Sequence, residues 1–93
     1  MTDLERLAVR VFQVIADDAD VAAEDLTLAT QIAGDLYLPR TARTSLAYRL
    51  ECEFSIAFTE SDFSAIESQT ATVGDVLAAV RRHTSNLKAS TAA

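Results

Sequence analysis

Apolar side chains recur at helical intervals between residues 4 and 15, and this spacing predicts an amphipathic helix at the start of the chain. Thr2 and Glu5 have the spacing of a capping box, so we expect the helix to run from about residue 3 to residue 16. A helix with one apolar face must bury that face against other elements. The periodic residues are Leu4, Leu7, Val11, Val14 and Ile15.

Three later segments carry comparable helical signals. Pro39 can occupy the first position of a second helix that reaches about residue 54, because the missing N–H of proline costs nothing there. Thr59 or Ser61 can cap a short third helix, and Thr72 with Asp75 has the spacing of a cap for a fourth. The apolar residues on these three helices are Leu46, Leu50, Phe54, Phe63, Ile66, Val73, Val76, Leu77 and Val80.

The segment between the first two predicted helices is long and polar. We expect residues 17–38 to form a partly ordered loop that lies over the core, with four apolar anchors at Val21, Leu26, Leu28 and Ile32. The acidic residues in this segment lack the spacing and central glycine of a calcium-binding loop, so they predict only weak, nonspecific ion binding. They are Asp17, Asp18, Asp20, Glu24 and Asp25.

Length and composition limit what such a chain can be. Its 93 residues predict one domain, over residues 1–84, followed by a flexible tail over residues 85–93 that lacks apolar periodicity. The single cysteine, Cys52, permits no intramolecular disulfide. The sequence shows no secretory leader and no apolar run of membrane-spanning length. We therefore expect a monomeric, cytoplasmic protein that does not bind a membrane. The net charge of −6 argues against a nucleic-acid partner.

Four helices with a long first connection and a short third helix resemble the acyl carrier protein family. The resemblance covers about residues 4–83 and implies an all-α, four-helix bundle. It rests on the apolar register and on particular residues along the second helix and at the start of the fourth. These residues are Asp35, Leu36, Leu46, Leu50, Glu51, Glu53, Phe54, Thr72 and Val73.

The attachment motif of that family is altered here. Carrier proteins of this family read Asp-Leu-Gly-x-Asp-Ser-Leu, and their serine holds a 4′-phosphopantetheine arm at the start of the second helix. In the resembling register Tyr37 replaces the glycine, Pro39 the aspartate and Arg40 the serine, with Thr41 in place of the leucine. Arginine has no hydroxyl that can attack coenzyme A. The resemblance therefore implies a degenerate member that carries no prosthetic group.

Two hydroxyls offer an alternative attachment point. Ser45 lies in a Thr-Ser-Leu triplet but is five residues further into the helix, where a mid-helix, exposed serine is the simpler interpretation. Thr41 is adjacent to the expected position, and we expect it to cap the first turn instead. Under this alternative the chain is a divergent acyl or aminoacyl carrier primed with 4′-phosphopantetheine at Ser45 or Thr41.

The second helix also differs from carriers in charge. Carriers of this family display acidic side chains there to basic enzymes, whereas this chain keeps Glu51 and Glu53 and adds arginines. Such a surface predicts an acidic or neutral protein partner, because like charge opposes docking. The predicted docking residues are Arg40, Arg43, Ser45 and Arg49.

Other candidate sites are weak. His83 is the only histidine and is expected at the surface near the end of the fourth helix, and Cys52 is expected to be exposed. The sequence contains no catalytic triad, phosphate-binding glycine loop or metal-ligand cluster, which argues against an enzyme and against a metal cofactor. We therefore expect a non-catalytic interaction module of a fatty-acid, polyketide or peptide-type biosynthetic pathway. A binder of free lipid within the core is a third reading.

Overall fold

The computed structural model describes the backbone of residues 3–92 and the side chains of residues 3–84. Within residues 3–92 the chain forms four α-helices and one short 3-10 helix, and no strand occurs there. The elements are α1 (Asp3–Ala19), η1 (Ala23–Asp25), α2 (Arg40–Phe54), α3 (Glu60–Glu67) and α4 (Val73–Ala92). The predicted all-helical bundle, with its long first connection and its short third helix, is confirmed.

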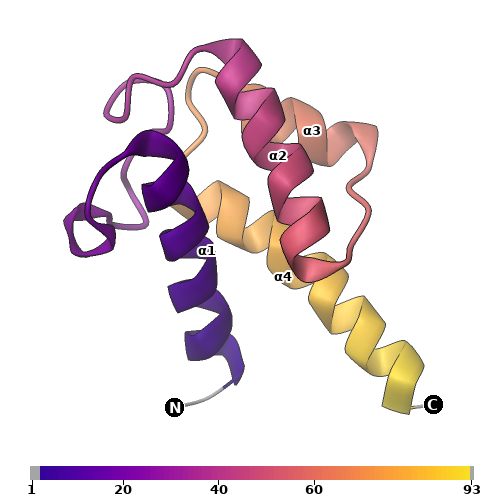
Figure 1. Ribbon diagram of the computed structural model, residues 1–93. Coiled ribbons are helices and arrows are strands. Elements are labelled where there is room, and N and C mark those ends of the chain that lie inside the picture. The colour runs from indigo at the N-terminus through magenta and orange to yellow at the C-terminus, as the bar shows by residue number, and fades with distance from the viewer. Residues whose placement is uncertain (1–2, 93) are drawn as a thin grey trace.

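The helices form a small bundle in which α1 packs on α4 and α2 packs on α3 (Figure 1). α2 also contacts α1 and α4, and α4 also contacts α3, so α2 and α4 each contact the other three helices. α1 begins and α4 ends at the same end of the bundle, and the two helices diverge toward that end. The start of α2 lies at the opposite end, beside the long loop.

One continuous core joins the helices. The apolar stripes predicted from the sequence supply most of it, and they are buried because only one face of each helix is apolar. Phe54, Phe63, Leu7 and Leu77 are partly buried against the core, whereas Leu4 is exposed. The large side chains with essentially no exposure are Ile15, Ile32, Leu46, Leu50, Ile66, Val11, Val73, Val76 and Val80.

α1 ends at Ala19, three residues beyond the expected end at residue 16. The helix ends where Asp20 takes a left-handed conformation with φ of 57°, and the Val21 N–H donates to the Ala16 carbonyl at 3.0 Å. A left-handed residue after the last turn is a common helix stop, and aspartate tolerates it better than most residues. The two aspartates at positions 17 and 18 therefore lie within the last turn of the helix and do not mark its end.

The later helix boundaries follow local capping. At α3 the Thr59 hydroxyl accepts from the Asp62 N–H while the Asp62 carboxylate accepts from the Thr59 N–H. Thr72 and Asp75 make the same reciprocal pair before α4, which confirms both predicted caps. Thr2, the predicted cap of α1, lies outside the described residues. α2 ends at a left-handed Ser55 with φ of 53°.

The loop between α1 and α2 is tied to the connection between α3 and α4. The N–H of Ile32 donates to the Ala71 carbonyl at 3.0 Å, and the N–H of Val73 donates to the Thr30 carbonyl at 2.9 Å. The N–H of Gly74 donates to the Leu28 carbonyl at 2.9 Å, and a Cβ at position 74 would meet that oxygen at 3.0 Å. The loop is therefore held by backbone hydrogen bonds although it has little regular structure.

Only half of the expected loop anchors are buried. Leu26 and Ile32 enter the core, whereas Val21 and Leu28 are exposed, so the prediction is wrong for those two residues. Leu28 is nevertheless tied to α4 through its backbone, because its carbonyl accepts from the Gly74 N–H. Apolar residues without periodicity in a loop carry no signal of which side they face.

α4 continues to Ala92, so the helix does not end near residue 84 as expected. The side chains of residues 85–92 and all of Ala93 lie outside the described part of the chain. Flexibility of the segment from 85 to 93 stays a prediction.

Candidate functional site

The start of α2 is the position where the sequence suggested a site. Pro39 is the N-cap with φ of −69°, one residue earlier than its expected place as the first helical residue, and no side chain caps the helix. Thr41 is the second residue of α2 and makes no capping hydrogen bond, so its predicted capping role is wrong. Its side chain is exposed. The first turn therefore presents backbone N–H groups that no side chain of the cap residue satisfies.

Arg40 begins α2 and points into solvent. Its side chain is 78% exposed, and its only ion pair among the described residues is a 3.8 Å contact with a carboxylate oxygen of Glu67. A cation at a helix N-terminus opposes the helix dipole, and an ion pair this exposed contributes about 0–1 kcal/mol. Arg40 therefore contributes little to the packing or the stability of the fold.

Arg43 is buried, and the prediction that it belongs to a docking face is wrong. Its guanidinium donates three hydrogen bonds to backbone carbonyls. Nε and Nη2 reach the Glu67 carbonyl at 3.0 and 2.9 Å, and Nη1 reaches the Leu38 carbonyl at 2.7 Å. Glu67 is the last residue of α3, so the charge lies at the negative end of that helix dipole. Arg43 therefore joins three segments of the fold.

Arg49 is also engaged inside the molecule. Its Nη2 donates to Asp17 at 2.8 Å, and its Nη1 donates to Asp18, both on α1. The hydrogen bonds to Asp17 and then Asp18 raise the pKa of Arg49 above its usual value. The predicted docking role of Arg49 has no support in this geometry, since a partner would have to displace two carboxylates.

The outward face of α2 is nearly uncharged. Thr41, Ser45, Tyr48 and Cys52 follow one another at helical spacing along it, and all four are exposed. Exposure of Ser45 and Cys52 is as predicted. Tyr48 is 57% exposed and lies with its ring 5.1 Å from that of Phe63 on α3.

Tyr37 adds a second exposed aromatic ring just before α2. It is 84% exposed and takes a left-handed backbone conformation with φ of 57°. A bulky residue rarely adopts this conformation, and glycine is the residue that usually does. We call Tyr37, Arg40, Thr41, Ser45, Tyr48 and Cys52 the α2 surface.

The two acidic side chains retained on α2, Glu51 and Glu53, both have partners within the fold. A Glu51 carboxylate oxygen accepts from the Phe58 N–H at 2.7 Å, which holds the α2–α3 connection. Glu53 lies 3.8 Å from Arg10 of α1, and the Arg10 guanidinium lies 4.6 Å from the centre of the Phe54 ring. Glu51 is therefore engaged within the fold, whereas Glu53 is exposed where α2 meets α1.

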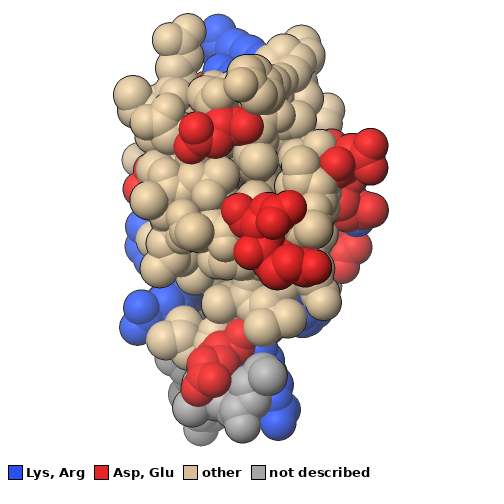
Figure 2. Space-filling model, turned by 90° about the vertical axis from the view of Figure 1, so that its left-hand side faces the viewer, with Lys and Arg blue, Asp and Glu red and all other residues tan. Residues whose placement is uncertain are grey.

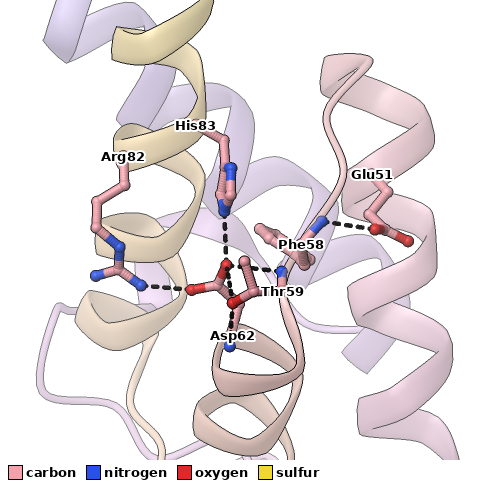
Figure 3. Close-up of polar contacts among 6 residues, drawn as sticks. All are labelled: Glu51, Phe58, Thr59, Asp62, Arg82 and His83. Carbon is pink, nitrogen blue, oxygen red and sulfur yellow. Dashed lines mark hydrogen bonds and ion pairs between the residues drawn. The ribbon is translucent and has the colours of Figure 1, made fainter.

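A second polar centre joins α3 to α4 around Asp62 (Figure 3). One Asp62 oxygen accepts from Arg82 at 2.6 Å, and the other lies 2.6 Å from Nε2 of His83. The second oxygen also accepts from the N–H and the hydroxyl of Thr59 at 3.0 and 3.1 Å. The carboxylate is buried, and all its contacts come from groups that can donate.

These contacts set the charge of Asp62. Burial opposes ionisation and raises the pKa of a carboxyl, but the hydrogen bonds from His83, Thr59 and Arg82 outweigh it and lower the pKa of Asp62 well below its usual value. His83 is only 20% exposed and stacks edge-on against Phe58, with ring centres 5.6 Å apart. The prediction of a surface histidine is therefore wrong, because His83 turns inward to a buried carboxylate.

The sequence reasoning missed Asp62 altogether. The available signal was the spacing of Thr59 and Asp62, which is that of a capping box, but the prediction named only Thr59 or Ser61 as the cap and not Asp62 as its partner. The arrangement resembles the base-and-orienter half of a catalytic set, yet no described serine, threonine or cysteine hydroxyl or thiol contacts His83. It acts in the described structure as a buried polar tie between two helices.

The described residues contain no group of three or more histidine, cysteine or acidic side chains placed to hold a metal ion. The acidic residues between positions 17 and 25 do not form one, and two of them, Asp17 and Asp18 of α1, pair with Arg49 instead. No helix within residues 3–92 is long and apolar enough to cross a membrane.

Neither a model of a known protein family nor the sequence of any curated protein matches this chain.

Proposed function

We propose that this chain is a carrier-protein-like interaction module that has lost the phosphopantetheine arm and docks a protein partner through the α2 surface. The observation that carries the proposal is the start of α2. Arg40 is the first helical residue and is exposed at the position that the family resemblance gives to the modified serine. The left-handed Tyr37 supports the same register, because that resemblance gives its position to glycine.

The docking surface is narrower than the four residues expected from sequence. Arg43 and Arg49 are occupied within the fold, which leaves Arg40 and Ser45 of the original set. Tyr37 and Tyr48 join them as exposed aromatic residues, a type enriched at protein interfaces together with arginine. One arginine among uncharged groups fits a neutral or mildly acidic patch on an enzyme of a fatty-acid, polyketide or peptide-type pathway.

A modification assay tests the loss of the arm. The purified chain is incubated with coenzyme A and a broad-specificity phosphopantetheinyl transferase, beside a functional carrier protein as positive control, and intact masses are measured. We expect no mass gain on this chain. The alternative, a divergent carrier, draws on the exposed hydroxyls of Thr41 and Ser45. A stoichiometric gain that disappears in Thr41→Ala or Ser45→Ala would establish it and refute the proposal.

A crosslinking assay tests the docking surface. A photo-reactive side chain is placed at position 45 of the α2 surface or, as a control, at the exposed position 24 of η1. We expect a discrete crosslinked partner from position 45 only, and loss of that product when Arg40→Glu is added. Ala22→Glu adds a negative charge at the exposed position 22 beside η1 and should leave the product intact. Equal yields with Arg40→Glu and Ala22→Glu would refute docking through Arg40.

A further inference from the structure

A second surface of this chain lies between the first turns of α1 and the middle of α4, away from the start of α2 (Figure 1). The two helices enclose a groove of about 550 Å³. Its lining joins apolar and basic side chains, with one acid at the rim. The lining residues are Asp3, Leu4, Arg6, Leu7, Arg10, Arg81 and Thr84.

The groove is basic although the chain is acidic. Three of the eight lysine and arginine residues of a chain with net charge −6 line it. Arg6 and Arg81 are exposed, and within the described residues no acidic side chain forms an ion pair with either. Seen from the α1 side, acidic groups are scattered over the face, whereas basic groups lie mainly at its edges and lower end (Figure 2). Uncompensated positive charge of this kind attracts an acidic partner.

The floor of the groove is apolar. Leu7 packs partly against the core, and Leu4 stands 45% exposed one turn earlier on the same face of α1. An exposed leucine flanked by arginines has the anatomy of an interface, with an apolar centre and a charged rim. A partner segment would cover Leu4 and bring its own charges to Arg6 and Arg81.

We infer that the α1–α4 groove binds an acidic amphipathic helix of a protein partner. Its apolar stripe lies on Leu4 and Leu7, and its acidic flanks pair with Arg6 and Arg81. A free anionic lipid fits less well, because small-molecule sites enclose most of the ligand and this groove is walled by exposed side chains of two diverging helices. This inference is independent of the proposed docking through α2.

A designed peptide probes the groove directly. It has about 18 residues of alanine, glutamate and leucine, with leucines at i, i+4, i+7 and i+11 so that they form one stripe. Fluorescence anisotropy with the labelled peptide should show saturable binding to the whole protein, weakening several-fold on raising salt from about 0.05 M to about 0.3 M. We expect Arg6→Glu/Arg81→Glu to weaken binding at least about tenfold, and Leu4→Ser about fivefold.

Matched controls separate this site from nonspecific attraction. Ala22→Glu/Ala29→Glu adds two negative charges at exposed positions of the loop between α1 and α2 and should leave the peptide affinity within about twofold. A peptide of the same composition with its leucines scattered around the helix should bind at least about tenfold more weakly than the striped one. Circular dichroism melts establish that each variant is folded, and a variant that does not fold is replaced by Arg6→Gln/Arg81→Gln.

Three outcomes would overturn the inference. Unchanged affinity in the folded double variant would place the peptide elsewhere. Equal affinities of the striped and scattered peptides would show that the peptide binds through charge attraction alone. Displacement of the peptide by decanoate at micromolar concentration, with direct decanoate binding lost in Arg6→Glu/Arg81→Glu, would assign the groove to a small anionic amphiphile instead.

Discussion

Replacement of Arg43 by alanine should destabilise the fold far more than the loss of an exposed arginine from the same helix would. The substitution removes three hydrogen bonds and leaves the carbonyls of Glu67 and Leu38 without their donor. Each buried carbonyl left unsatisfied costs about 1–3 kcal/mol, and some relief comes from water near the exposed loop, so we expect a loss of about 3 kcal/mol. In a domain of this size that loss lowers the melting temperature by about 12 °C or more.

Urea denaturation at neutral pH, followed by circular dichroism, measures the change in the free energy of unfolding. Arg40→Ala is the matched control, because Arg40 lies one turn earlier on α2 and is exposed, so its loss should change stability by less than about 0.5 kcal/mol. Arg43→Lys keeps the charge but reaches fewer carbonyl sites, so it should recover about half of the loss. Equal stabilities of Arg43→Ala and Arg40→Ala would show that the three hydrogen bonds contribute nothing net.

Two further predictions concern Asp62 and Tyr37. Asp62→Asn should reduce the free energy of unfolding by about 2 kcal/mol at neutral pH, since it removes the charge that holds Arg82 and His83. Because the pKa of Asp62 is lowered in the folded state, its contribution is fully present above the unfolded value of about 3.9 and is lost as the pH falls below it. Denaturation curves of both proteins between neutral and strongly acidic pH should therefore converge on acidification, and a constant gap would contradict this account. Tyr37→Gly should raise the melting temperature slightly, by up to about 5 °C, because it relieves a left-handed conformation and removes an exposed ring. Tyr37→Ala keeps the backbone penalty and serves as the control, so an equal effect of both substitutions would assign the change to the ring.

The helices were largely predictable from the sequence because their signals are local. Thr59 and Thr72 each stand three residues before an aspartate, and the apolar stripe of α2 recurs every four residues. Burial of Leu46, Leu50 and Ile66 then follows from the pattern. The end of α1 was less predictable, because Asp17 and Asp18 continue the helix to meet Arg49, a residue far along the chain.

The candidate site was predicted only in part, and the errors have one physical origin. Arg43 donates to backbone carbonyls, which every residue carries, so nothing in the sequence marks its partners. His83 meets Asp62 only because α4 packs on α3, and their separation of 21 residues has no local signature. Arg40 makes only an exposed 3.8 Å ion pair with Glu67, so the exposure of Arg40 and Ser45 could be inferred from the helical register.

The hydrogen bonds between the long loop and the start of α4 bear on how the molecule opens. The amides of Ile32, Val73 and Gly74 point across that boundary, so all three become solvent-accessible only when the two segments separate. In amide hydrogen exchange they should lose their protection together, with one common opening free energy, although Ile32 belongs to no regular element. Loop and helix start thus behave as one cooperative unit, and a partner that orders either one slows exchange in both.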